Sequence, residues 1–198
     1  MSNKNDKSIW EQRYQEGTTG WDRGKASPNL STWLEQGDLQ PCRILIPGCG
    51  NGYEILELAS RGFEVVAVDI AASPIRNAKK MLQANHLQAE LIESDLFALD
   101  FRNTPFDAIY EQTCLCALEP TDWQAYEQWL YDSLKEKGKL YAHFLQNGRE
   151  GGPPYHCDMT AMKDLFDKTR WTWEKALKPT PMSTLTNAQE SPFLLIRQ

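Results

Sequence analysis

The chain has 198 residues, of which 41% are hydrophobic and 24% charged, a composition that excludes an intrinsically disordered protein. Its net charge of −6 at pH 7 disfavours a protein that binds nucleic acid through the phosphate backbone. No apolar run approaches the ~20 residues of a membrane span, and the polar first eight residues lack the apolar core of a secretory signal. We therefore expect one cytoplasmic domain over residues 1–198, monomeric, without membrane or nucleic-acid partners.

The N-terminal 40 residues place aromatic side chains among turn-forming residues. Trp10 and Tyr14 are four residues apart and share one face of a predicted helix, while Trp21 follows in a glycine-flanked loop. These aromatic residues either pack into the core or cover a site. Residues 1–40 are therefore expected to form an N-terminal helical segment ahead of the core, residues 41–198.

From residue 41 onward, strand and helix patterns alternate. Short apolar runs predict buried strands, and apolar residues at helical spacing predict the helices between them. The predicted strands are residues 43–47, 63–70, 89–94, 106–111 and 139–144, and the predicted helices are residues 53–61, 74–85 and 123–137. This alternation indicates crossover connections and a parallel sheet that is covered on both faces.

The C-terminal part follows a different pattern. A helix is predicted over residues 158–167 and strands over residues 171–177 and 192–197, with a stretch rich in Pro, Ser and Thr between the two strands. Because no crossover helix separates these strands, we expect them to be antiparallel neighbours. The predicted fold is a doubly wound, mostly parallel, seven-stranded Rossmann-like α/β sheet that ends in an antiparallel hairpin.

A glycine-rich turn between the first predicted strand and helix is the strongest motif. Gly48, Gly50 and Gly52 allow a tight turn and the close approach of a ligand. Asp69, 19 residues after Gly50, ends the next strand, where a carboxylate can accept hydrogen bonds from both ribose hydroxyls. Asp95 closes the third strand in the same way. Each feature alone also fits a tight turn or a helix cap, but together they predict a nucleotide site along one sheet edge.

The spacing of the glycines bears on which nucleotide binds. The dinucleotide fingerprint requires a third glycine at position 53, where this chain has Tyr53, and no Gly-Lys-Ser/Thr phosphate loop occurs. The G-x-G-x-G spacing suits a ligand without a pyrophosphate and so favours S-adenosylmethionine. A nicotinamide-dependent oxidoreductase and a non-catalytic sensor remain as alternatives.

The cysteines do not predict a metal site. The chain has five, an odd number, and the closest pair forms C-x-C rather than C-x-x-C. We expect reduced thiols and no bound metal. The cysteines are Cys42, Cys49, Cys114, Cys116 and Cys157.

Several segments together resemble one family. The chain looks like the class I methyltransferases and, within them, like the thiopurine S-methyltransferase superfamily, which includes the halide/thiol methyltransferases. The segments that carry the resemblance are Trp10 and Tyr14 with Thr19-Gly20-Trp21-Asp22, Ile46-Pro47-Gly48-Cys49-Gly50, Ala67-Val68-Asp69-Ile70, Cys116-Ala117-Leu118-Glu119-Pro120 and Gly151-Gly152-Pro153-Pro154-Tyr155. One departure is Tyr14, where halide/thiol members often carry Trp.

The resemblance implies a cofactor and a set of site residues. S-adenosyl-L-methionine is the implied methyl donor, with S-adenosyl-L-homocysteine as its product, and Trp10, Tyr14 and Trp21 would fold over it as a lid. The other implied cofactor-binding residues are Gly48, Gly50, Asp69, Asp95, Leu96 and Glu111. The loop with Tyr155 and His156 would close on the acceptor, which makes these two the candidate catalytic residues; a rigid surface turn is the other interpretation.

The expected reaction is transfer of a methyl group to a small soft nucleophile, sulfur first and halide second. The signature of amino-methylating nucleic-acid enzymes is absent after the fourth strand, where the chain reads Gln112-Thr113-Cys114-Leu115. A thiol acceptor needs no dedicated base, because a few per cent of it is ionised at neutral pH. An O- or N-directed methyltransferase and a protein that binds the cofactor without catalysis are the remaining alternatives.

Overall fold

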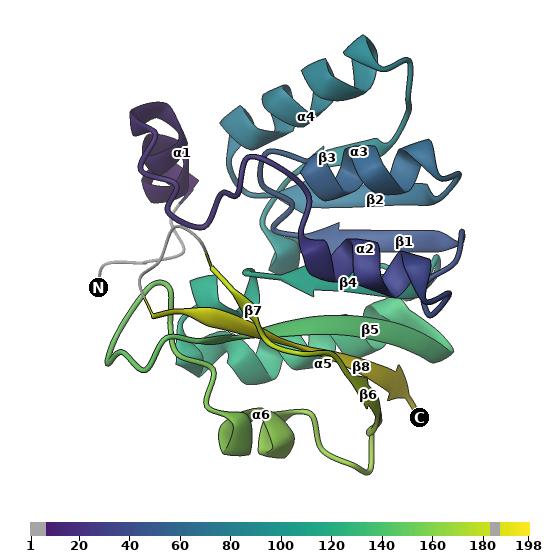
Figure 1. Cartoon of the computed structure of the whole chain (residues 1–198), viewed down its shortest axis with the longest axis vertical. Helices are drawn as coiled ribbons and strands as arrows, with labels where there is room; N and C mark the ends of the chain where they lie inside the picture. Colours follow the sequence, from purple (N-terminus) through teal and green to yellow (C-terminus); the bar gives the residue numbers. More distant parts are fainter. Residues whose placement is uncertain (1–6, 183–186) are drawn as a thin grey trace.

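The computed structural model describes residues 7–182 and 187–198. Residues 1–6 of the polar N-terminal stretch, and residues 183–186 of the stretch rich in Pro, Ser and Thr, lie outside the described residues. One sheet runs through the molecule, with helices on both of its faces (Figure 1). Among the described residues, no helix is long and apolar enough to cross a membrane.

The sheet has the strand order β3-β2-β1-β4-β5-β8-β6, and the short β7 pairs with β8 outside this path. The strands are β1 (Arg43–Pro47), β2 (Glu64–Asp69), β3 (Glu90–Glu93), β4 (Phe106–Gln112), β5 (Leu134–Gln146), β6 (Trp171–Ala176), β7 (Thr180–Pro181) and β8 (Gln189–Arg197). The first five strands of the path are parallel, whereas β8 is antiparallel to both β5 and β6. This confirms the predicted α/β class and its C-terminal antiparallel pair.

The described residues form six α-helices, of which α2 to α6 cover the sheet. They are α1 (Lys7–Glu16), α2 (Pro28–Glu35), α3 (Tyr53–Ser60), α4 (Ala72–Ala84), α5 (Trp123–Ser133) and α6 (Met159–Leu165). Three short 3-10 helices among the described residues lie between β3 and α5, namely η1 (Leu96–Ala98), η2 (Leu115–Ala117) and η3 (Pro120–Asp122).

Apolar strands with two buried faces divide the core into two layers. In β1, Leu45 packs with α5 and α6, whereas its neighbours Ile44 and Ile46 pack with α2, α3 and α4. Successive side chains of a strand point to opposite faces, so an uninterrupted apolar run requires a helical layer on each side. The sheet edge where β1, β2 and β4 end stays accessible between these layers.

The boundary between α5 and β5 differs from the sequence prediction. Helix α5 ends at Ser133 rather than at residue 137, because Leu134 is fully buried and pairs with Phe106 across the sheet. Gly138 consequently lies within β5 instead of ending the helix. The sequence analysis also missed α2, although Ser27 accepts a hydrogen bond from the Asn29 N–H and Pro28 occupies the first turn.

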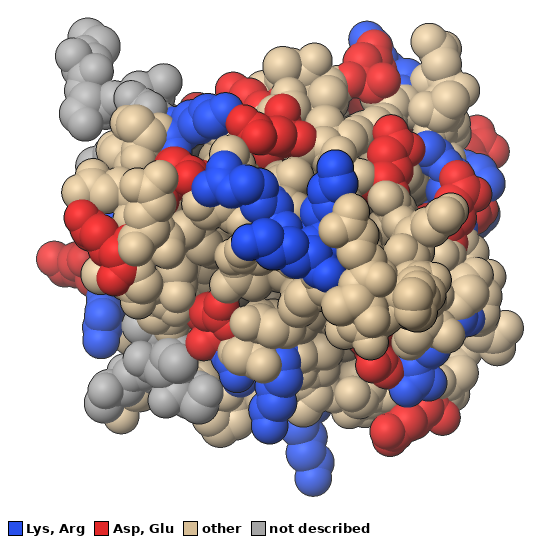
Figure 2. All heavy atoms as spheres, turned by 90° about the horizontal axis from the view of Figure 1, so that it is seen from above, with Lys and Arg blue, Asp and Glu red and all other residues tan. Residues whose placement is uncertain are grey.

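The molecular surface carries both signs of charge. Figure 2 shows the face on the side of α4, where acidic and basic side chains lie interspersed. Helix α4 contributes exposed Arg76, Lys79 and Lys80 to this region. One of these cations is already paired, because Arg76 contacts Glu11 of α1 at 3.2 Å.

Candidate active site

The turns after β1 and β4 meet at the carboxyl edge of the sheet. Gly48 has a φ of +58°, and a Cβ atom at this position would lie 2.9 Å from the Cys114 Sγ atom. Any side chain at position 48 would therefore suffer both backbone strain and a steric clash. The glycine lets the two turns touch and leaves open space in front of them.

Asp69 lies at the end of β2 and holds the glycine turn. Its carboxylate accepts hydrogen bonds from the Gly50 N–H at 3.0 Å and from the Ala71 N–H at 2.9 Å. The residue is 6% exposed, and burial raises its pKa to about 6, although the two amide hydrogen bonds oppose this shift. The side chain thus links β1 and β2 and still contributes to the wall of a cavity.

A cavity of about 270 Å³ opens in front of these strand ends, and we call it the large cavity. It brings together most of the residues that the sequence analysis assigned to the cofactor. Those that line it are Trp10, Tyr14, Trp21, Gly48, Asp69, Asp95 and Leu96. Gly50 instead lines a neighbouring small cavity of about 60 Å³, and Glu111, Tyr155 and His156 line neither.

The three N-terminal aromatic residues form one cluster over the large cavity, which we call the aromatic lid. The ring of Trp21 lies edge-on to Trp10 at 5.5 Å and to Tyr14 at 5.8 Å between ring centroids. The Arg13 guanidinium lies 5.0 Å from the Trp10 ring centroid, in cation–π geometry. Helix α1 itself has no buried residue, so Trp10 and Tyr14 lie outside the sheet's core, whereas the partly buried Trp21 packs against that core.

Polar contacts attach α1 to the rest of the molecule. The Glu11 carboxylate accepts hydrogen bonds from the Ser73 N–H at 2.8 Å and from the Ser73 hydroxyl at 2.6 Å. These hydrogen bonds lower the pKa of Glu11 to about 2, so the carboxylate is ionised at neutral pH. Lys7 forms an ion pair with Glu93 of β3. The lid helix is thus attached by contacts that exchange readily with water.

Glu111 is buried beneath the turn after β4. One carboxylate oxygen accepts hydrogen bonds from the Cys114 N–H at 3.1 Å and the Leu115 N–H at 2.8 Å. The residue is 1% exposed, and burial raises its pKa to about 7. In this position it orders the turn and has no surface on the large cavity.

Tyr155 and His156 organise the loop that follows β5. The Tyr155 hydroxyl donates a hydrogen bond to the Glu119 carboxylate at 2.6 Å, and its N–H donates to the Cys116 carbonyl at 2.7 Å. The His156 Nδ1 atom accepts hydrogen bonds from the N–H groups of Asn147 and Gly148, each at 3.2 Å. Their neighbour Pro154 lines the large cavity, so the two side chains hold the loop that forms this wall.

The large cavity is also lined by apolar and sulfur-bearing side chains that the sequence analysis did not assign to the site. They are Cys114, Cys116, Ala117, Leu118, Leu145 and Met182. Burial raises the pKa of the Cys114 and Cys116 thiols, so both stay neutral. The cysteines follow the end of β4 and were open to prediction from that position, whereas Met182 follows a stretch without periodicity. The described residues contain no cluster of side chains able to hold a metal ion.

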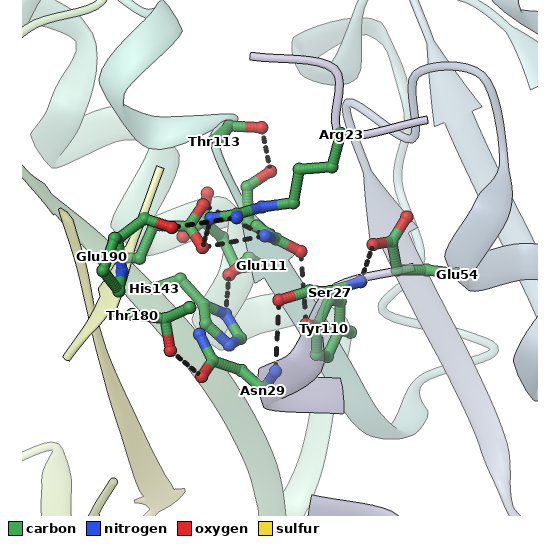
Figure 3. A network of polar contacts seen from close by, with 12 residues as sticks. Arg23, Ser27, Asn29, Glu54, Tyr110, Glu111, Thr113, His143, Thr180 and Glu190 are labelled. Carbon is green, nitrogen blue, oxygen red and sulfur yellow. Dashed lines mark hydrogen bonds and ion pairs between the residues drawn. The ribbon is translucent and has the colours of Figure 1, made fainter. Parts of the chain in front are cut away.

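A buried polar network lies behind the site (Figure 3). Glu190 of β8 accepts hydrogen bonds from the Gln112 amide at 2.9 Å and forms an ion pair with Arg23 at 3.0 Å. The Gln112 amide oxygen also accepts a hydrogen bond from the Tyr110 hydroxyl at 3.2 Å. Since Arg23 follows Trp21 by two residues, the network fixes the segment after the aromatic lid to the ends of β4 and β8. No sequence motif indicated this pairing.

Comparisons with known proteins agree with this architecture. The family described as thiopurine S-methyltransferase matches residues 5–192. A probable thiol methyltransferase 2 from Arabidopsis thaliana is 31% identical over 169 residues, which cover 84% of this chain and 74% of that protein. A thiopurine S-methyltransferase from Xanthomonas axonopodis pv. citri (strain 306) is 29% identical over 179 residues, 82% of each chain.

The fold is also found among solved structures. Magnesium protoporphyrin IX methyltransferase from Synechocystis PCC 6803, solved with bound S-adenosylmethionine, superposes with a TM-score of 0.76 at 15% identity, covering 100% of this chain and 98% of that one. At this identity the likeness concerns the fold alone, while the family match covers nearly the whole chain. The chain therefore belongs to the thiopurine S-methyltransferase family of S-adenosylmethionine-dependent methyltransferases.

Proposed function

We propose that this chain transfers the methyl group of S-adenosylmethionine to a small soft nucleophile, with sulfur acceptors preferred and halide ions second. The observation that carries the proposal is the large cavity, whose lining combines a buried carboxylate and an aromatic lid with apolar and sulfur-bearing side chains. The relatives' names, thiol methyltransferase and thiopurine S-methyltransferase, support sulfur as the acceptor atom.

The residues of the large cavity suit this cofactor. Each carboxylate oxygen of Asp69 accepts one hydrogen bond from a backbone N–H and retains a further lone pair that can accept from a ribose hydroxyl. Asp95, Leu96 and the 41% exposed Phe97 also line the large cavity, and they suit an adenine ring. The faces of Trp10 and Trp21 suit a sulfonium cation, which aromatic rings stabilise.

The bound cofactor supplies an electrophilic methyl group on a positively charged sulfur. A lone pair of a thiolate or halide acceptor would form the new bond to carbon as the carbon–sulfonium bond breaks, which would leave a neutral thioether. The protein's contribution is alignment and the exclusion of water. Leu145 and Met182 provide a dry wall for a soft acceptor, and the loop held by Tyr155 and His156 completes it.

The acceptor class can be tested with one incubation series. We expect methyl-tritiated S-adenosylmethionine to yield labelled volatile or soluble products with small thiols, thiopurines, thiocyanate, iodide, and selenium or tellurium anions. Phenols and amines of matched size serve as the controls. Label found only on oxygen or nitrogen acceptors would contradict the proposal, and stoichiometric binding without any transfer would identify a non-catalytic cofactor-binding protein.

We also propose that the chain acts as one monomeric catalytic domain in the cytoplasm. The Arg23–Glu190 ion pair joins the N-terminal segment to β8 of the single sheet, which supports one domain. The five free cysteines suit a reducing compartment. Light scattering after size-exclusion chromatography should give the mass of one chain, 22.7 kDa.

A further inference from the structure

The large and the small cavity share three residues of their walls. These are Trp21, Gly48 and Thr113. The small cavity lies along the glycine turn and is lined by the polar and charged side chains Arg23, Lys25 and Asn51. If the adenosine occupies the large cavity and the amino-acid end extends along the glycine turn, the sulfonium that joins them lies at the shared residues.

Thr113 occupies this junction in a strained conformation. Its φ of +60° is in the left-handed region, which a β-branched residue rarely adopts. Such strain persists only where the surroundings enforce it, and it concentrates at functional sites. The Thr113 hydroxyl donates its proton to the Gln112 carbonyl at 2.7 Å (Figure 3). The oxygen therefore has lone pairs, but no further proton, to offer the cavity.

The neighbouring contacts enforce this conformation from both sides. Before Thr113, the Gln112 amide is held by the buried Glu190 carboxylate. After it, the Glu111 carboxylate accepts hydrogen bonds from the N–H groups of Cys114 and Leu115. The Cys116 thiol in turn lies 3.4 Å from the Thr113 carbonyl oxygen. Two fully buried carboxylates thus hold one strained residue at the cavity junction.

We propose that Thr113 is a positioning residue whose hydroxyl oxygen accepts C–H···O contacts from the electron-poor sulfonium methyl group. The inference rests on the proposed function. Gly48 lines the junction with its backbone, Trp21 provides an aromatic ring, and Thr113 provides the oxygen. The contact aligns the methyl group toward the sulfur-lined wall. S-adenosylhomocysteine lacks this methyl group and cannot make the contact.

The test compares the two forms of the cofactor rather than activity alone. Thr113→Val and Thr113→Ala remove the oxygen, and Thr113→Ser retains it. In calorimetry, Thr113→Val and Thr113→Ala should lower the affinity for S-adenosylmethionine about two- to fivefold more than the affinity for S-adenosylhomocysteine, as expected for weak C–H···O contacts. Thr113→Ser should keep the wild-type ratio of the two affinities. Thr104→Val, at an exposed position at the opposite sheet edge, should leave this ratio unchanged.

The outcomes separate this inference from the proposed function. An unchanged affinity ratio in both Val and Ala would overturn the role of Thr113 while leaving methyl transfer by the wild type intact. The wild type could instead transfer no methyl group while the affinity ratio still falls in Thr113→Val and Thr113→Ala. That result would overturn the proposed function and leave the contact in place. If Thr113→Val fails to fold, as judged by its unfolding temperature, the Ala variant decides. A lower kcat with an unchanged KM for the acceptor supports alignment.

Discussion

At the scale of single residues, Asp69 shows how one side chain serves both fold and site. Its carboxylate accepts two backbone N–H groups and so fixes the glycine turn next to the end of β2. The burial that makes this arrangement rigid also raises its pKa to about 6. The site therefore contains a group whose charge changes within two pH units of neutrality.

We expect the affinity for S-adenosylhomocysteine to fall as the pH drops through about 6. Below this pH Asp69 is protonated and loses the negative charge that strengthens its hydrogen bonds from the ribose hydroxyls. Calorimetry between pH 5 and 8 checks this. Asp69→Asn should bind at least about tenfold more weakly at pH 8, because it lacks the charge-assisted contacts, and should show no such pH step. A step of equal size in Asp69→Asn would assign it to another group.

At the scale of elements, α1 differs from the helices that cover the sheet. It buries no side chain, and its attachment to α4 depends on the hydrogen bonds that Glu11 accepts from Ser73. A helix with few buried contacts opens at low cost in free energy. Ligand contacts with Trp10, Tyr14 and Trp21 would then supply much of its stability.

We expect backbone amides before about residue 30 to gain hydrogen-exchange protection when S-adenosylhomocysteine binds. Glu11→Gln should raise exchange in α1 without ligand and weaken binding about threefold, in the range of a partly exposed ion pair. The unfolding temperature should barely change, since Glu11 does not belong to the core. Equal protection of this segment with and without ligand would make the aromatic lid an ordinary part of the fold.

The loop after β5 allows a second test at this scale. Tyr155→Phe removes the hydroxyl that donates to Glu119, and His156→Ala removes the acceptor of two loop amides. Each should lower kcat/KM for the acceptor about 10–100-fold, the range for losing such hydrogen bonds. S-adenosylhomocysteine affinity should stay within about twofold, because neither side chain lines the large cavity. Loss of cofactor binding in both variants would contradict a role confined to the acceptor side.

At the scale of the whole molecule, the sequence predicts the sheet well because its patterns are local. The apolar runs of β1 and β2, the glycine turn and Asp69 each follow from neighbouring residues. Pairings between distant segments leave no such pattern, and Arg23 with Glu190, or Met182 at the cavity wall, are examples. The end of α5 was mispredicted for the same reason, because the burial of Leu134 beside Phe106 decides it.

The same distinction applies to the candidate site. Positions at strand ends were predictable because parallel strands end at one edge, and seven of the expected residues line the large cavity. Side-chain direction was not predictable for Glu111, which follows Tyr110 in β4 but is held beneath the next turn by two amides. A carboxylate near a ligand edge thus indicates the edge but does not decide what the carboxylate contacts.

The pH dependence of turnover tests the whole arrangement. Between pH 7 and 9, turnover of a small thiol should rise as its thiolate fraction grows toward the thiol pKa of ~8.5, whereas turnover of iodide, which has no proton to lose, should stay nearly flat. In this range Asp69 is already ionised, because its pKa is about 6, and the Cys114 and Cys116 thiols remain neutral, because burial raises their pKa. These cavity-lining groups therefore keep their charge while the thiol changes, whereas Glu111, with a pKa of about 7, lies off the cavity and would affect both acceptors alike. An equal rise for iodide would assign the pH dependence to a titrating group of the protein. Loss of thiol transfer in His156→Ala, with iodide transfer and cofactor binding preserved, would require a proton-transferring group of the protein in place of a mechanism based on alignment and desolvation.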